Sequence, residues 1–200
     1  MEASGETRRG RRALRFGALV VLALAAAVGI WLFVRDRNQD NRSTPTAPMT
    51  TGGRSSVVRA SQQALARMSR LTRRPIYWAG PQRKMKLELT RTAGGRVFIR
   101  YLPLNVEIGD RRGRYLIVGT YPVVNAHRAI QRAAKESGAH RLRLRGGVLG
   151  VYNDRTPTNV YFAAPRSNYQ IEVYNPNPSR ALALVKSGKI RPIRLKSSGG

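Results

Sequence analysis

Cysteine is absent from the 200-residue chain, and acidic residues and histidines are scarce. Without Cys the chain has no thiol nucleophile, disulfide framework, Cys-ligated zinc or iron–sulfur cluster. Ten Asp and Glu residues stand against 37 Lys and Arg, giving a formal net charge of +27. This charge predicts attraction to polyanions, whether nucleic acid, anionic lipid or an acidic polymer. The length allows one ordinary domain with an appendage.

Motifs that hold metals, nucleotides or a catalytic serine are also missing. The two histidines, His127 and His140, have no metal-ligand spacing such as H-E-x-x-H, so we expect both to be structural. The chain has no G-x-S-x-G elbow, no Walker loop and no dinucleotide-binding glycine loop. We therefore expect no metal and no cofactor.

One uncharged run, residues 16–34, has the length of a membrane span. As a helix it would be about 28 Å long, close to the hydrocarbon core of about 30 Å. A cleaved signal peptide is the alternative, with Ala25-Ala26-Ala27 as the cleavage site, but the apolar run continues well beyond these alanines. We therefore expect an uncleaved transmembrane signal anchor. The charged flanks argue against a buried helix of a soluble protein.

Arginines on the two sides of this run predict its orientation. Those that precede it are Arg8, Arg9, Arg11, Arg12 and Arg15, and those that follow it are Arg35, Arg37 and Arg42. The excess on the amino-terminal side favours a cytoplasmic N-terminus. We expect residues 1–15 to form a cytoplasmic basic tail and residues 35–200 to lie outside the cytoplasm, in the cell envelope.

Two segments separate the predicted span from the domain. Residues 35–54 are polar, contain two prolines and two glycines, and predict a flexible linker. Residues 55–73 have helical periodicity and predict an amphipathic helix. Its apolar stripe is Val57, Ala64, Leu65, Met68 and Leu71, and its basic stripe is Arg59, Arg67, Arg70 and Arg74. Such a helix lies on anionic lipid head groups or packs on the domain with a solvated Arg face, and the second is expected.

Residues 75–195 predict an α+β domain, with a mainly antiparallel sheet and two inserted helices. The helices are expected at residues 125–137 and 178–186. The strands are expected at residues 86–102 (a hairpin), 115–121, 141–145, 148–152, 160–164, 169–174 and 190–195. In residues 169–174, Gln170, Glu172 and Tyr174 alternate with apolar side chains and are expected to face water.

The hairpin register follows from its loop length. A three-residue loop at residues 93–95 pairs Leu89 with Ile99, and it sets Glu88 opposite Arg100. A two-residue loop would place Leu89 against Arg100. We expect the three-residue loop, with an exposed Glu88–Arg100 pair that contributes roughly 0–1 kcal/mol.

Two groups of side chains are candidates for ligand binding. Arg141, Arg143 and Arg145 alternate with Leu142 and Leu144, which on a strand places the three cations on one face for phosphates or carboxylates. A solvated face is the plainer interpretation. The candidates for a sugar-stacking aromatic platform are Tyr77, Trp78, Tyr101 and Tyr121. Such residues more often belong to the hydrophobic core.

A catalytic alternative rests on carboxylates. A glycosidase needs two carboxylates that face one cleft. The candidate pair is Asp110 and Asp154, both on predicted loops. Each precedes an arginine, which is typical of a turn with a local partner. We therefore expect no catalytic residue.

Several strings occur together in a fixed order. They are Tyr77-Trp78-Ala79-Gly80-Pro81, Arg100-Tyr101-Leu102-Pro103, Gly109-Asp110, Val118-Gly119-Thr120-Tyr121-Pro122 and Glu172-Val173-Tyr174-Asn175-Pro176. In this order they resemble a group of single-pass, membrane-anchored bacterial proteins from high-GC actinobacteria, over about residues 75–193. The resemblance implies an anchored domain and implies no activity, ligand or site.

The sequence thus favours a non-enzymatic, membrane-tethered envelope domain that binds or scaffolds, with an anionic lipid or wall polymer as ligand. One alternative is a hydrolase of envelope polymer that uses Asp110 or Asp154. Another is a nucleic-acid-binding protein, which requires the inverted topology, since nucleic acid is not expected outside the cytoplasm. A protein partner is not indicated.

Overall fold

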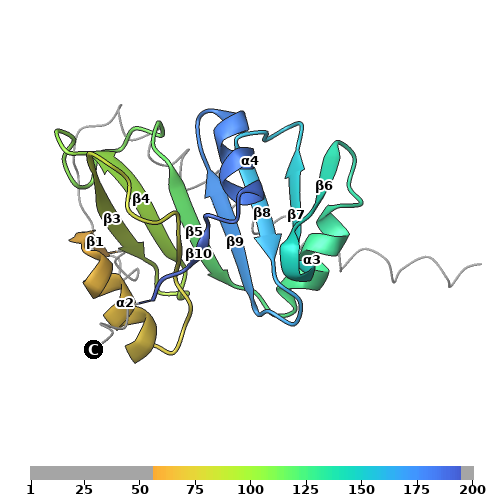
Figure 1. Ribbon diagram of the computed structural model, residues 1–200, viewed down its shortest axis with the longest axis horizontal. Helices are drawn as coiled ribbons and strands as arrows, with labels where there is room; N and C mark the ends of the chain where they lie inside the picture. Colours follow the sequence, from red (N-terminus) through yellow and green to blue (C-terminus); the bar gives the residue numbers. More distant parts are fainter. Residues whose placement is uncertain (1–55, 195–200) are drawn as a thin grey trace, which may run out of the picture. The chain divides into compact units, whose positions relative to one another are not determined.

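The computed structural model describes residues 56–194, and these form an α+β domain on one eight-stranded antiparallel sheet (Figure 1). The strand order is β1-β3-β4-β5-β9-β8-β7-β6. The strands are β1 (Ser56–Ala60), β3 (Met85–Arg91), β4 (Val97–Pro103), β5 (Ile117–Pro122), β6 (Ala139–Arg143), β7 (Leu149–Asn153), β8 (Asn159–Ala163) and β9 (Tyr169–Tyr174). This architecture is the fold class that the sequence predicts.

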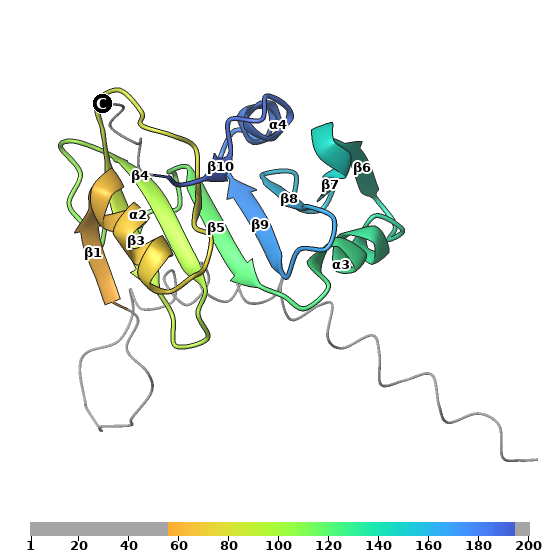
Figure 2. The same ribbon diagram turned by 60° about the horizontal axis from the view of Figure 1, so that its bottom comes forward.

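Helices cover both faces of the sheet (Figure 2). Helices α2 (Gln62–Leu71) and α4 (Pro178–Lys186) lie on one face, where Leu65 and Val185 join the larger core with Ile99, Val118 and other strand residues. Helix α3 (Ala126–Ala133) lies on the opposite face. Its Ala126 and Ile130 form a second, smaller cluster with apolar residues of β7 and β8.

A short ribbon fills the space between α2 and α4 (Figure 1). It consists of β2 (Tyr77–Trp78) and β10 (Arg191–Pro192), which pair antiparallel. The Tyr77 amide donates to Thr120 Oγ1 of β5 at 3.0 Å, and the nearby Ala79 amide donates to Tyr101 Oη of β4 at 2.7 Å. These two bonds fix the ribbon to the middle of the sheet. The closing strand predicted at 190–195 is shorter than expected, because β10 contains only Arg191 and Pro192.

The β3–β4 hairpin has the predicted register. Leu89 pairs with Ile99 and Glu88 pairs with Arg100. Around the three-residue loop at 93–95, the Thr92 amide donates to the Arg96 carbonyl at 3.1 Å. Gly95 supplies the left-handed conformation that this loop type needs, with φ of 75°.

The prediction of one helix over residues 55–73 was wrong in its first part. Residues Ser56–Ala60 form β1, which pairs with β3 along its whole length, and the helix begins only at Gln62. Ser61 caps it, because its Oγ accepts from the Ala64 amide at 3.1 Å. Since Leu65 and Ala66 are buried, α2 is an integral third helix of the domain, packed as expected of a helix on its surface.

The expectation of a solvated face on residues 169–174 was also wrong. In β9, Gln170 and Glu172 are 7% and 2% exposed, so both faces of this central strand are covered. No helix within residues 56–194 is long and apolar enough to cross a membrane. The predicted tail, span and linker, residues 1–54, lie outside the described residues.

Candidate cationic binding surface

The described domain carries 27 Lys and Arg residues but only six carboxylates. Four of the carboxylates have a polar side-chain partner, and two of these four, Glu88 and Glu172, are buried. Glu88 pairs with Arg100, Asp110 with Arg112 and Asp154 with His140, while Glu172 is bonded to Tyr121 and Asn159. The outer surface is therefore dominated by positive charge.

The Glu88–Arg100 pair is buried, which corrects the expectation of an exposed pair. Arg100 Nε lies 3.3 Å from Glu88 Oε1, and the two side chains are 6% and 0% exposed. The loop between β4 and β5 covers them. The Gly109 amide donates to Glu88 Oε2 at 2.6 Å, Arg100 Nη2 donates to the Asp110 carbonyl, and Arg100 lies 5.4 Å from the centre of the Tyr115 ring.

The β4–β5 loop carries three exposed cations, Arg111, Arg112 and Arg114. Arg112 donates to both carboxylate oxygens of Asp110, and these hydrogen bonds lower the pKa of Asp110 to about 2. Asp110 therefore stays ionised at any physiological pH and acts as a turn residue with a local partner. Tyr174 donates through its hydroxyl to the Gly113 carbonyl and holds the far side of the loop.

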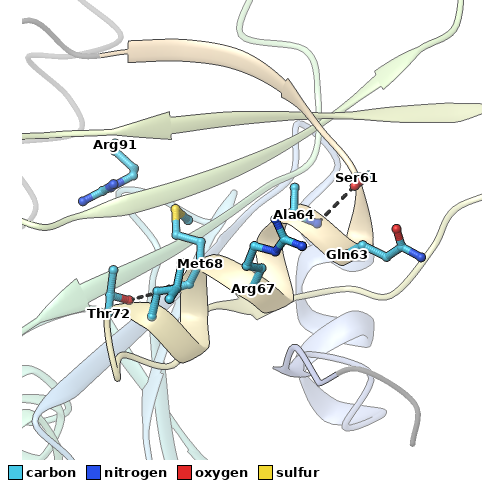
Figure 3. A pocket seen from close by; sticks show the side chains of 8 residues that line it. Ser61, Gln63, Ala64, Arg67, Met68, Thr72 and Arg91 are labelled. Carbon is cyan, nitrogen blue, oxygen red and sulfur yellow. Dashed lines mark hydrogen bonds between the residues drawn. The ribbon is translucent and has the colours of Figure 1, made fainter. Parts of the chain in front are cut away.

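A shallow groove of about 510 Å³ lies along α2, beside the end of β3 (Figure 3). Arg67 on α2 and Arg91 at the end of β3 line it, together with the polar side chains of Ser61, Gln63 and Thr72. Its apolar lining is Ala64, Met68 and Leu71. The β1–β3 pairing brings Arg67 and Arg91 together although they are far apart in sequence.

The arginines predicted from the alternating pattern lie on and beside an edge strand. Arg141 and Arg143 belong to β6 and share one face of it, with their Cα atoms about 6.6 Å apart. Arg145 is outside the strand, because it begins the short 3₁₀ turn Arg145–Gly147. All three are exposed. They form a cationic edge without a pocket.

The predicted aromatic platform is not exposed. Trp78, Tyr101 and Tyr121 are buried, and Tyr77 is half-buried against Phe162 with ring centres 6.1 Å apart. Burial raises the pKa of Tyr101 above its ordinary value. These residues are core, so they present no stacking surface for a sugar.

The two carboxylates of the hydrolase alternative are not brought together. Asp110 is held by Arg100 of β4, whereas the Asp154 amide donates to the Gly138 carbonyl at the β6–β7 end of the sheet. Strands β4 and β7 are four positions apart, which corresponds to about 19 Å. Paired glycosidase carboxyl groups are separated by roughly 5–9.5 Å.

The structure instead places Asp154 beside a histidine. His140 Nε2 lies 2.7 Å from Asp154 Oδ1, and the His140 ring stacks on Tyr152 at 4.7 Å between ring centres. His127 Nε2 lies 3.3 Å from the Gly147 carbonyl. Among the described residues, no group of three or more His, Asp or Glu side chains is placed to hold a metal ion.

A buried polar cluster surrounds Glu172, which the sequence pattern had placed in water. Tyr121 donates to Glu172 Oε2, Asn159 Nδ2 donates to Oε1 at 2.5 Å, and Tyr161 also bonds the carboxyl group. Gly119 lies opposite Glu172, and a Cβ there would be 2.7 Å from the Tyr121 ring. A glycine inside a central strand is the signal that marks such a close approach.

The Glu172 cluster predicts a distinct pH dependence of stability. Burial raises the pKa of Glu172 above its ordinary 4.5, despite the opposing hydrogen bonds. The unfolded chain therefore ionises first, and folding loses stability as the pH rises from about 4.5 towards the folded-state pKa. We expect the stability of the native chain relative to a Glu172→Gln variant to fall over this range. Denaturant unfolding of both proteins at a series of pH values measures this change. A stability difference between them that stays constant with pH would contradict the prediction.

No family model, curated protein or solved structure matches the chain.

Proposed function

We propose that the chain is a membrane-anchored protein of the cell envelope whose domain lies outside the cytoplasm and binds anionic lipids or polymers without catalysing a reaction. The anchor is residues 16–34, oriented by its flanking arginines. The resemblance to anchored actinobacterial proteins agrees with this arrangement.

One observation carries the binding part of the proposal. Residues 56–194 hold 27 cations and six carboxylates. Two of those carboxylates, Glu88 and Glu172, are buried, and Asp110 and Asp154 each pair with a neighbouring side chain. A surface charged in this way attracts polyanions over long range. The places of Asp110 and Asp154, on loops after strands that are four positions apart in the sheet, favour binding over the hydrolase alternative.

The binding is expected to be diffuse for a soluble polymer. Full-length protein in nanodiscs of zwitterionic phosphatidylcholine should bind labelled polyphosphate at low salt. The attraction should disappear as the Debye length falls from about 30 Å at about 0.01 M to about 8 Å at about 0.15 M salt. A salt titration monitored by fluorescence anisotropy measures this loss.

Two triple variants provide the matched control. The first replaces Arg141, Arg143 and Arg145 by Ala, and the second replaces Arg155, Arg180 and Lys189 by Ala. Both remove three exposed charges, so both should weaken binding equally. Salt-resistant binding that only the first variant abolishes would show a specific site on β6. No binding at low salt would contradict the proposed function.

A further inference from the structure

We propose that the outer side of α2 and the groove beside it form the surface by which the domain docks on the phosphate groups of an anionic lipid bilayer. This inference rests on the proposed membrane-anchored function and names the site and the ligand.

Within the described sequence, all charged residues on α2 and in the segments next to it are cations. Residues 56–87 contain eight Lys and Arg residues and no acid. The next residue, Glu88, is buried with Arg100 and points away from α2, since Leu87 and Leu89 on either side of it pack in the core beneath that helix. The cations on or beside α2 are Arg67, Arg70, Arg73, Arg74 and Arg91.

The same surface also has apolar side chains. Leu71 is 78% exposed and lines the groove with Met68 and Ala64. Arg67 and Arg91 line the same groove (Figure 3). A guanidinium group binds a phosphate in a bidentate manner. Exposed apolar side chains among such cations match the boundary between lipid head groups and acyl chains. A hydrophilic polymer offers no partner for Leu71, so the composition favours a lipid.

The groove lies where the chain enters the domain. The described domain begins at Ser56, which pairs directly with Arg91 at the end of the groove. The predicted span, residues 16–34, precedes Ser56 in the sequence. Tethering raises the effective concentration of lipid phosphate near the surface, which lets weak contacts persist at physiological salt.

The opposite edge of the sheet serves as a control. Arg141 and Arg143 on β6 are also exposed cations. Among the described residues, the exposed large apolar side chains are Val58, Leu71, Met85, Leu104 and Val124, and none of them belongs to β6. If charge alone determined lipid binding, the β6 edge and the α2 surface would contact the bilayer equally. Docking through α2 predicts contact at the α2 surface only.

The absence of cysteine allows a direct measurement. Full-length protein with Leu71→Cys or Thr156→Cys is labelled with an environment-sensitive fluorophore and placed in vesicles that contain nitroxide-labelled lipids. Position 156 is exposed, in the loop between β7 and β8. In vesicles with phosphatidylglycerol at about 0.15 M salt, we expect several-fold stronger quenching at position 71 than at position 156. We expect this excess to be lost in pure phosphatidylcholine.

Two double variants decide whether the site is specific. Arg67→Gln with Arg91→Gln should abolish the excess quenching at position 71, whereas Arg141→Gln with Arg143→Gln should leave it unchanged. Equal quenching at both positions, or equal effects of the two double variants, would overturn the proposal. Displacement of the label from the vesicles by soluble polyphosphate, at the same phosphate concentration, would indicate a polymer site and overturn the lipid assignment.

A carbonate wash of the same vesicles separates this inference from the proposed function. Loss of the protein from the washed vesicles would contradict the anchor and overturn both. Protein that is retained but remains unquenched at position 71 would overturn the docking surface alone.

Discussion

Replacing Arg100 by Ala is expected to lower the free energy of unfolding by about 3–5 kcal/mol. The Glu88 side chain is fully buried and its carboxylate would lose the charged partner that lies 3.3 Å away. An uncompensated buried charge is costly because it has been removed from water without a replacement interaction. The Gly109 amide alone cannot supply this compensation.

A double variant separates the loss of the pair from the loss of packing. Glu88→Leu combined with Arg100→Leu removes both charges and retains apolar volume, so it should recover much of the lost stability. Denaturant unfolding of the full-length chain in detergent measures the stability of the single and the double variant. The chain has two tryptophans, so a Trp31→Phe background leaves the buried Trp78 as the reporter. A loss below about 1 kcal/mol for Arg100→Ala would indicate an exposed pair instead.

Leu65→Ala is expected to destabilise the domain by about 2–5 kcal/mol. Leu65 is 0% exposed and belongs to the larger core, so its truncation removes apolar contacts and leaves a cavity beneath α2. A helix that lay on lipid and made no contact with the domain would not show this effect.

Leu71→Ala is the matched control for this experiment. Leu71 belongs to the same helix and has the same side chain, but it is 78% exposed. Its replacement should change the free energy of unfolding by no more than about 0.5 kcal/mol. Equal effects of the two substitutions would contradict the packing of α2 on the sheet.

The hairpin of β3 and β4 shows which features local sequence determines. Alternation of apolar residues and a glycine-containing loop were sufficient to predict that Leu89 faces Ile99 and that Glu88 faces Arg100. The burial of that ion pair was not predictable in the same way. It depends on Gly109 and Tyr115, which a long loop brings back over the sheet.

Strand β1 shows how tertiary pairing overrides local periodicity. Val57 was assigned to the predicted helical stripe. However, Val57 and its neighbour Val58 are β-branched and pair with Thr90 and Leu89 of β3. The sequence pattern contains no information about that partner strand. For the same reason, alternation along β9 predicted a wet face, although Tyr121 and Tyr161 from the neighbouring strands cover Glu172.

The candidate surface was predictable only in part. The alternation of Arg141 and Arg143 correctly placed two exposed cations on one face of a strand. The groove was not predictable, because Arg67 and Arg91 approach one another only after β1 pairs with β3 and α2 folds back along them. The strings on which the expected resemblance rests contain residues of the buried networks, including Arg100, Tyr121 and Glu172.

The side of the membrane on which the domain lies is the most direct test of the proposed function. Two fusion proteins are compared, one with a reporter enzyme after Gly200 that is active only outside the cytoplasm, and one with a reporter there that is active only inside. We expect activity from the outside reporter alone. Activity from the inside reporter alone would contradict the proposed envelope function, and it would favour the nucleic-acid-binding alternative for this strongly basic domain.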